Sequence, residues 1–170
     1  MEIFSIENGL VSNFLIVYLP ILNKLLLAIF LGSAIGIERT LANKMAGMRT
    51  YAFVSLGSAL FIIIGQIISS EYTGIVSLDP LMRLASSIIM GIGFLCGGLI
   101  IYHDNKLFGL TTAAGMWVAT GIGIAVGFGL YMVAIFSTIL TIFVFSTLWD
   151  VEQKVQKTFE GKYDNEDSNS

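Results

Sequence analysis

Charged residues are scarce in this chain of 170 residues. They make up 12% of the sequence, whereas soluble domains carry about 25%. Hydrophobic residues make up 55%, and the mean hydropathy is +0.83. So few charges cannot cover the surface of a water-soluble fold, and so much apolar surface excludes intrinsic disorder. The composition therefore predicts a membrane protein whose main partner is the lipid bilayer.

Cysteine, proline and histidine are nearly absent. Cys96 is the single cysteine, so an internal disulfide is excluded. The net charge of −3, without a basic cluster, argues against nucleic-acid binding. The single histidine, His103, precedes Asp104 with no further histidine or cysteine nearby, which favours a solvated loop over a metal site. We therefore predict no metal site and no cofactor.

Five apolar stretches approach the length of about 20 residues that crosses a bilayer. They cover residues 21–37, 51–69, 84–102, 113–126 and 129–149. Lipid tolerates no unsatisfied backbone groups, so each should be an α-helix. The expected fold is an all-α polytopic membrane bundle of about five helices in residues 21–149. Residues 1–20 are expected to form an N-terminal interfacial segment or an extension of the first span. Residues 150–170 predict a cytoplasmic tail, partly helical and then disordered.

Basic residues divide unevenly between the two sides of the predicted bundle. Seven of the nine lie in the loop between spans one and two, the loop between spans three and four, and the tail; Lys24 and Arg83 lie on the other side. The positive-inside rule then places the first group in the cytoplasm. The N-terminus is expected outside and the C-terminus inside.

The chain contains a candidate internal repeat. The segment AGMRTYAFVSLGSALFIIIG from Ala46 aligns with FGLTTAAGMWVATGIGIAVG from Phe108, 62 positions later, and upstream the shift becomes 64. This predicts two helical hairpins of the same orientation, related by an axis along the membrane normal. The alternative is chance similarity between apolar helices rich in Gly, Ala and Ile.

Each copy places a glycine shortly before a threonine where its second helix begins. The segments are Gly47 to Thr50 and Gly109 to Thr112, the latter including Thr111. Glycine supplies turn conformations that other residues avoid, and threonine can cap the helix that follows. A helix N-terminus can also bind an anion, although plain capping is the favoured interpretation.

Small residues recur at helical spacing in several spans. Glycines four apart let helix backbones approach closely in lipid, so we predict packing roles, with a glycine-lined solute path as the alternative. The glycines concerned are Gly32, Gly36, Gly91, Gly93, Gly97, Gly98, Gly123 and Gly127.

Charged and hydroxyl residues near the cytoplasmic ends of the spans form a candidate functional centre. Charges at membrane depth are usually paired, so we predict a Glu38–Arg39 or Glu38–Arg49 network; the alternative is that these charges only set orientation. The centre comprises Glu38, Arg39, Arg49, Thr50, Thr111 and Thr112. On the external side, Asp79 reads as the N-cap of the third span, with Arg83 four residues later as an ion-pair partner.

Catalytic signatures are missing from the sequence. It has no visible nucleophile–base–acid set, no phosphate-binding loop and no nucleotide fingerprint. We therefore do not expect an enzyme.

Several motifs together resemble the MgtC/SapB family of bacterial membrane proteins. They are GSAIGIER from Gly32, AGMRT from Ala46, Arg83 followed by GIGFL from Gly91, and GLTTAA from Gly109 with Trp117. The match in order and spacing covers residues 31–129. Two positions depart from the pattern, Cys96-Gly97 and Gly115, which affects fine packing. Members of the MgtC branch carry a soluble C-terminal domain after the membrane part. This sequence does not include such a domain, so the resemblance is closer to the SapB side of the family.

The resemblance implies an inner-membrane protein linked to magnesium limitation and virulence adaptation. Together with the glycine-rich spans, it favours a non-enzymatic regulator that contacts other membrane proteins or itself, for example as a homodimer. The alternative is a transporter or channel for Mg²⁺ or another ion. Few carboxylates lie in the spans, so Mg²⁺ is only weakly suggested.

Overall fold

The computed structural model describes residues 2–103 and 106–147. Its helices are α1 (Glu2–Leu41), α2 (Met48–Thr73), α3 (Leu78–Leu99) and α4 (Leu110–Phe128), and a further helix, Tyr131–Thr147, runs to the end of the described residues. Two strands, β1 (Ile101–His103) and β2 (Lys106–Phe108), lie between α3 and α4. The predicted all-α bundle of about five helices is confirmed. The strands are a correction to it, and the predicted tail lies outside the described residues.

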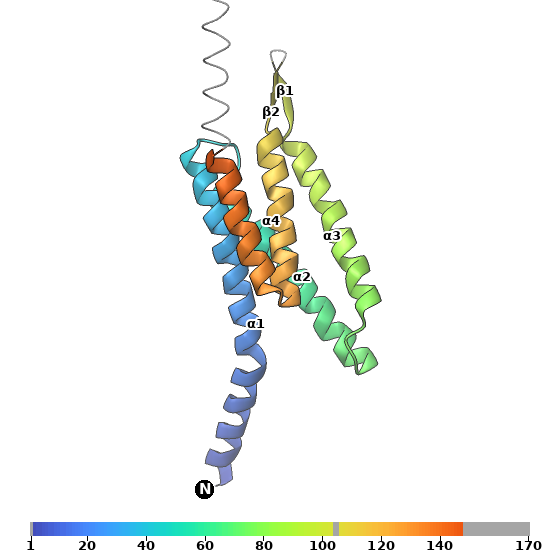
Figure 1. The fold of residues 1–170 in the computed structure, drawn as a ribbon. Coiled ribbons are helices and arrows are strands. Elements are labelled where there is room, and N and C mark those ends of the chain that lie inside the picture. Colours follow the sequence, from blue (N-terminus) through green and yellow to red (C-terminus); the bar gives the residue numbers. More distant parts are fainter. Residues whose placement is uncertain (1, 104–105, 148–170) are drawn as a thin grey trace, which may run out of the picture.

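Membrane-spanning length is reached by four helices in the part of the chain that the structure describes. These spans are Tyr18–Leu41, Met48–Tyr72, Leu78–Leu99 and Leu110–Phe128. Helix α1 continues without a break from Glu2 through Pro20, and its N-terminal part extends well beyond the rest of the bundle (Figure 1). Residues 2–20 are therefore helical and continuous with the first span, while their position along the membrane surface stays a prediction.

Two of the interhelical connections emerge at the same end of the bundle, which we call the loop end. The α1–α2 loop and the β1–β2 hairpin lie there together (Figure 1). The hairpin is antiparallel and pairs Ile101 with Phe108 and Tyr102 with Leu107. The sequence had suggested a simple loop here, since three-residue strands are too short to show an alternating pattern.

Helix α4 lies at the centre of the bundle and α3 at its edge. Along α4 most residues are buried, whereas α3 buries only Leu81, Ala85 and Ile92 among its described residues. Helix α1 packs along α2, and α2 packs along α4. The edge helix α3 contacts α4 and, more sparsely, α2 (Figure 1).

Four of the predicted packing glycines lie at the closest approaches between helices. A Cβ on Gly32 would lie 2.5 Å from the Tyr51 carbonyl oxygen, and one on Gly36 would lie 2.5 Å from Met48 Cα. Gly123 lies against the Ser55 carbonyl, and a Cβ on Gly127 would lie 2.7 Å from Ile62 Cβ. Backbone contacts of this kind leave no room for any side chain.

The glycines of α3 have no such neighbours. A Cβ on Gly91, Gly93, Gly97 or Gly98 would meet nothing within 4 Å. These four glycines therefore make no close helix contact within the described chain, and the packing role predicted for them stays a prediction. Their sequence spacing is suitable for close packing, but α3 lies at the edge of the bundle, where no helix of the described chain covers them.

Equivalent positions of the candidate repeat occupy equivalent places in the two hairpins. Gly32 lies against the carbonyl of Tyr51, and Cys96, its counterpart in α3, places its thiol 3.2 Å from the carbonyl oxygen of Ala113, the counterpart of Tyr51. A cysteine needs more room than a glycine, so α3 packs less extensively on α4 than α1 does on α2. The shared contact and the shared loop end support the parallel repeat.

Candidate functional site

Arg39 is a buried cation near the loop end of α1. Its side chain is 3% exposed, and its Nε contacts Glu38 Oε2 as an ion pair. The guanidinium carbon lies 3.6 Å from the centroid of the Phe145 ring, which comes from the helix Tyr131–Thr147. The Glu38 side chain is 18% exposed. A charge at membrane depth needs such partners, and of the two predicted pairs the structure forms Glu38–Arg39.

Tyr51 extends this cluster toward α4. The Tyr51 side chain is fully buried, and its hydroxyl donates a hydrogen bond to the Thr112 carbonyl oxygen at 3.1 Å. A Cβ on Gly115 would lie 2.5 Å from that hydroxyl oxygen and 2.6 Å from Phe145 Cζ. Because Gly115 has no side chain, Tyr51 and Phe145 can both pack against α4 at this position. We call Glu38, Arg39, Tyr51, Thr112 and Phe145 the polar cluster.

Three of the predicted centre residues lie outside the polar cluster. Arg49, Thr50 and Thr111 are exposed on the helix surfaces. Buried Thr112 contributes its carbonyl oxygen rather than a side-chain cap. The sequence placed all of these residues near the loop end, but the direction in which each side chain points depends on how α2 and α4 rotate against their neighbours.

The predicted threonine caps are also wrong. Helices α2 and α4 begin after Gly47 and Gly109, and neither start has a side-chain cap on its own N-cap residue. Instead, the Thr40 hydroxyl at the end of α1 accepts the Met48 N–H at 3.0 Å. Gly109 has φ +86° and lies against the Leu99 carbonyl, so only glycine suits it. Gly47 has φ −116° and is needed instead for its close approach to Thr40.

The external start of α3 also differs from its prediction. The N-cap is Ser77, not Asp79, and it makes no side-chain cap bond. Asp79 lies in the first turn, and both Asp79 and Arg83 are exposed. No ion pair joins these two side chains in the described structure. Pro80 in the first turn already favours a helix start here, so the acid is not needed as a cap.

Lys24 has a role that sequence reasoning missed. Its Nζ donates a hydrogen bond to the Gly127 carbonyl oxygen at 3.0 Å, across 103 positions of the chain. Gly127 lies in the last turn of α4, where unpaired carbonyls attract cations. The basic residue in an apolar span was a signal that it needed a partner, but the sequence could not show which helix end supplied it.

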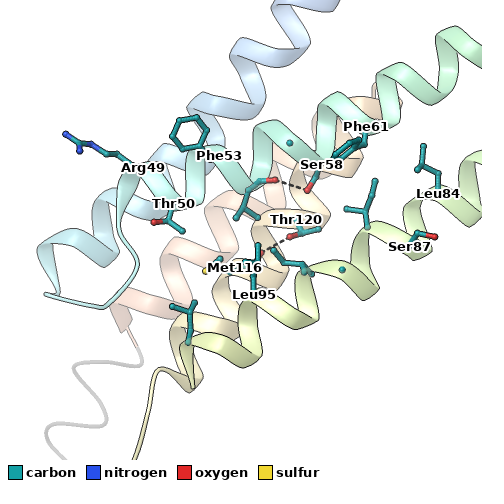
Figure 2. Close-up of a pocket in the computed structure, with 16 residues that line it drawn as sticks. Arg49, Thr50, Phe53, Ser58, Phe61, Leu84, Ser87, Leu95, Met116 and Thr120 are labelled. Carbon is teal, nitrogen blue, oxygen red and sulfur yellow. Dashed lines mark hydrogen bonds between the residues drawn. The ribbon is translucent and has the colours of Figure 1, made fainter. Parts of the chain in front are cut away.

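A cavity of about 810 Å³ lies between α2 and α3, with α4 as its floor. We call it the α2–α3 groove. Figure 2 shows Phe53 and Phe61 of α2, Leu84 and Leu95 of α3, and Met116 of α4 around it. Its other labelled lining residues are Arg49, Thr50, Ser58, Ser87 and Thr120. The lining includes no acidic residue.

Three of the hydroxyls in this lining are engaged within their own helices, and one of them is Ser87 Oγ, which donates to the Arg83 carbonyl oxygen at 3.0 Å. Ser58 Oγ donates to the Val54 carbonyl oxygen at 2.7 Å, and Thr120 Oγ1 donates to the Met116 carbonyl oxygen at 3.0 Å (Figure 2). Among the residues that the structure describes, no group of three or more His, Cys, Asp or Glu side chains could hold a metal ion. The groove therefore presents an apolar surface with one cationic residue, Arg49.

Comparison with known proteins gives one family and several curated relatives. The family model described as MgtC family matches residues 25–154. "Putative magnesium transporter YhiD" of Escherichia coli K12 is 37% identical over 126 residues, which are 71% of this chain and 57% of that protein. Protein MgtC of Salmonella typhimurium is 35% identical over 138 residues, 81% of this chain and 56% of that protein. The chain thus spans a little over half the length of these relatives. No solved structure matches significantly.

Proposed function

The chain belongs to the MgtC family, and from that premise we propose that it is a non-enzymatic, multi-pass protein of a bacterial inner membrane that regulates other membrane proteins, or copies of itself, by direct helix contact. The loop end faces the cytoplasm in this proposal, because Arg39, Lys44 and Arg49 lie there. The family resemblance links this role to magnesium limitation.

The polar cluster is the observation that carries the proposal. The Arg39 guanidinium is enclosed between Glu38 and the Phe145 ring, so the one acid of this region is already occupied by a cation of the chain. A buried and fully paired cluster of this kind is suited to holding the helices together rather than to binding a passing ion. A cation pathway instead needs carboxylates or broken helices that line a polar cavity, and the lining of the α2–α3 groove contains no acid.

Mg²⁺ transport is the rival function, since the Escherichia coli relative bears that name. We expect liposomes that contain the purified protein and a Mg²⁺-sensitive dye to show no faster influx than protein-free liposomes. The matched control is the folded Glu38→Gln variant in the same lipids. Influx in the wild type that disappears in Glu38→Gln would establish a transporter and overturn the regulatory proposal.

Self-association is the simplest contact that the proposal allows. A Cβ added to Gly93 or Gly97 of α3 would meet no atom of the described chain within 4 Å, so a second copy can approach that helix closely. We expect mass photometry in mild detergent, together with chemical cross-linking in membranes, to detect a homodimer. If only monomers were found at every protein concentration, self-association would be excluded. The proposal would then require contact with other membrane proteins.

A further inference from the structure

The α2–α3 groove is closed at one end and open at the other. Away from the loop end, α2 meets α3 where a Cβ on Gly65 would lie 2.6 Å from Leu84 Cδ2 and 3.0 Å from Leu81 Cδ2. Toward the loop end the two helices diverge (Figure 1), and Met116 and Thr120 of α4 line the space between them. An occupant must therefore enter from the loop end or sideways from the membrane.

The groove is shorter than the bilayer is thick. Its α2 lining runs from Arg49 to Phe61 and its α3 lining from Leu84 to Leu99, which are about 18 Å and about 22 Å at 1.5 Å per helical residue. The hydrocarbon core of a bilayer is about 30 Å thick. A transmembrane helix from a partner would extend along that full thickness and therefore well beyond the groove. An acyl chain needs only the half that lies under its own headgroup.

Charge in the groove is confined to its open end. Arg49 is the only charged residue in the lining, and Figure 2 shows its side chain extended away from the apolar residues at the loop-end side of the row. The exposed Thr50 lies next to it. Arginine binds phosphate groups through parallel hydrogen bonds, and a long basic side chain at a helix end reaches the headgroup region.

We propose that the groove binds an anionic phospholipid from the leaflet at the loop end. One acyl chain lies between α2 and α3, where Gly57 and Gly91 leave open space, and the headgroup phosphate contacts Arg49. A cavity of 810 Å³ falls within the usual range for small-molecule sites. This inference goes beyond the proposed function, because a lipid can occupy the groove whether the protein regulates or transports.

The test is native mass spectrometry of the full chain in mild detergent, titrated with phosphatidylglycerol or phosphatidylethanolamine. The wild type should retain phosphatidylglycerol preferentially. Arg49→Gln should weaken phosphatidylglycerol binding about fivefold, because one basic side chain near the headgroups is removed. Phosphatidylethanolamine binding should weaken less, because its phosphate is balanced by its own ammonium group. Gly91→Leu adds a side chain to the groove lining at a position where a Cβ would meet nothing within 4 Å, and it should reduce the binding of both lipids.

Gly93→Leu is the matched control, because it adds the same side chain to the same helix outside the groove lining. It should bind both lipids as the wild type does. Equal lipid retention by Gly91→Leu and Gly93→Leu would overturn the proposal, and so would an unchanged preference in Arg49→Gln. A dimer mass lost only in Gly91→Leu, without any lipid adduct in the wild type, would make the groove a protein interface instead.

Discussion

Replacement of Glu38 by alanine should lower the free energy of unfolding by about 3 kcal/mol. The loss follows from Arg39, whose side chain is 3% exposed. It would keep its charge in an apolar surrounding, and the Phe145 ring would be its remaining partner among the described residues. Removal of one member of a buried pair costs about 3–5 kcal/mol, and the low end applies because Glu38 remains 18% exposed. SDS-induced unfolding of the purified protein measures the change.

The same measurement separates pairing from a general effect of lost charge. Glu71→Ala removes an exposed acid from α2 and should change stability by no more than about 0.5 kcal/mol. The double variant Glu38→Ala/Arg39→Leu should recover much of the loss, because it removes both buried charges together. If Glu38→Ala proved as stable as Glu71→Ala, the ion pair would have no structural role.

An added methyl group should lower the stability of the protein at glycines that lie against a neighbouring helix. It should not lower stability at glycines that have open space around them. Gly32→Ala and Gly123→Ala place a Cβ against the carbonyls of Tyr51 and Ser55. These are backbone atoms of α2, so the helices themselves must separate. Overpacking of this kind costs about 1–3 kcal/mol. Both variants should unfold at lower SDS fractions than the wild type and accumulate less in membranes.

Gly93→Ala and Gly97→Ala serve as the matched controls, since their new Cβ atoms would meet nothing within 4 Å. At concentrations where the chain is monomeric, both should be neutral or stabilising by up to about 1 kcal/mol, because alanine is the better helix former. A loss of stability in these controls that appears at high protein concentration and disappears on dilution would show that a second copy packs on α3. A loss of the same size in all four variants, independent of concentration, would contradict the packing described for α1, α2 and α4.

Much of the architecture was readable from the sequence for a simple physical reason. A chain in lipid must satisfy its backbone hydrogen bonds within each segment, so apolar length alone locates the spans. The predicted spans fall within the described helices with few exceptions. In the third span, residue 100 caps α3 and residues 101–102 belong to β1. In the fifth span, residues 129–130 connect α4 to the last helix, and residues 148–149 lie outside the described residues. The resemblance to the family, drawn from the segments around Glu38, Thr50 and Gly109, is confirmed by the family comparison.

The candidate site was predictable only in part. Glu38 and Arg39 could be named as a pair because adjacent charges in an apolar span require partners. Tyr51 and Phe145 could not be named, since aromatic residues are common in membrane helices and their contacts with Arg39 and Thr112 join distant parts of the chain. Thr40 was missed for the same reason, because the cap of α2 comes from the end of α1 rather than from its own first turn.

The sequence by itself determined the membrane class, the helical spans, the family and the need of Arg39 for a counterion, because each depends on local composition or on a short motif. The tertiary structure alone decided which glycines lie against a neighbouring backbone, since Gly123 and Gly93 occur in equally suitable local patterns while only α4 lies at the centre of the bundle. It also decided where α2 and α3 diverge, and thus where an apolar groove with Arg49 at its open end exists. Helix rotation and crossing depend on contacts between distant segments, and a local pattern does not specify them.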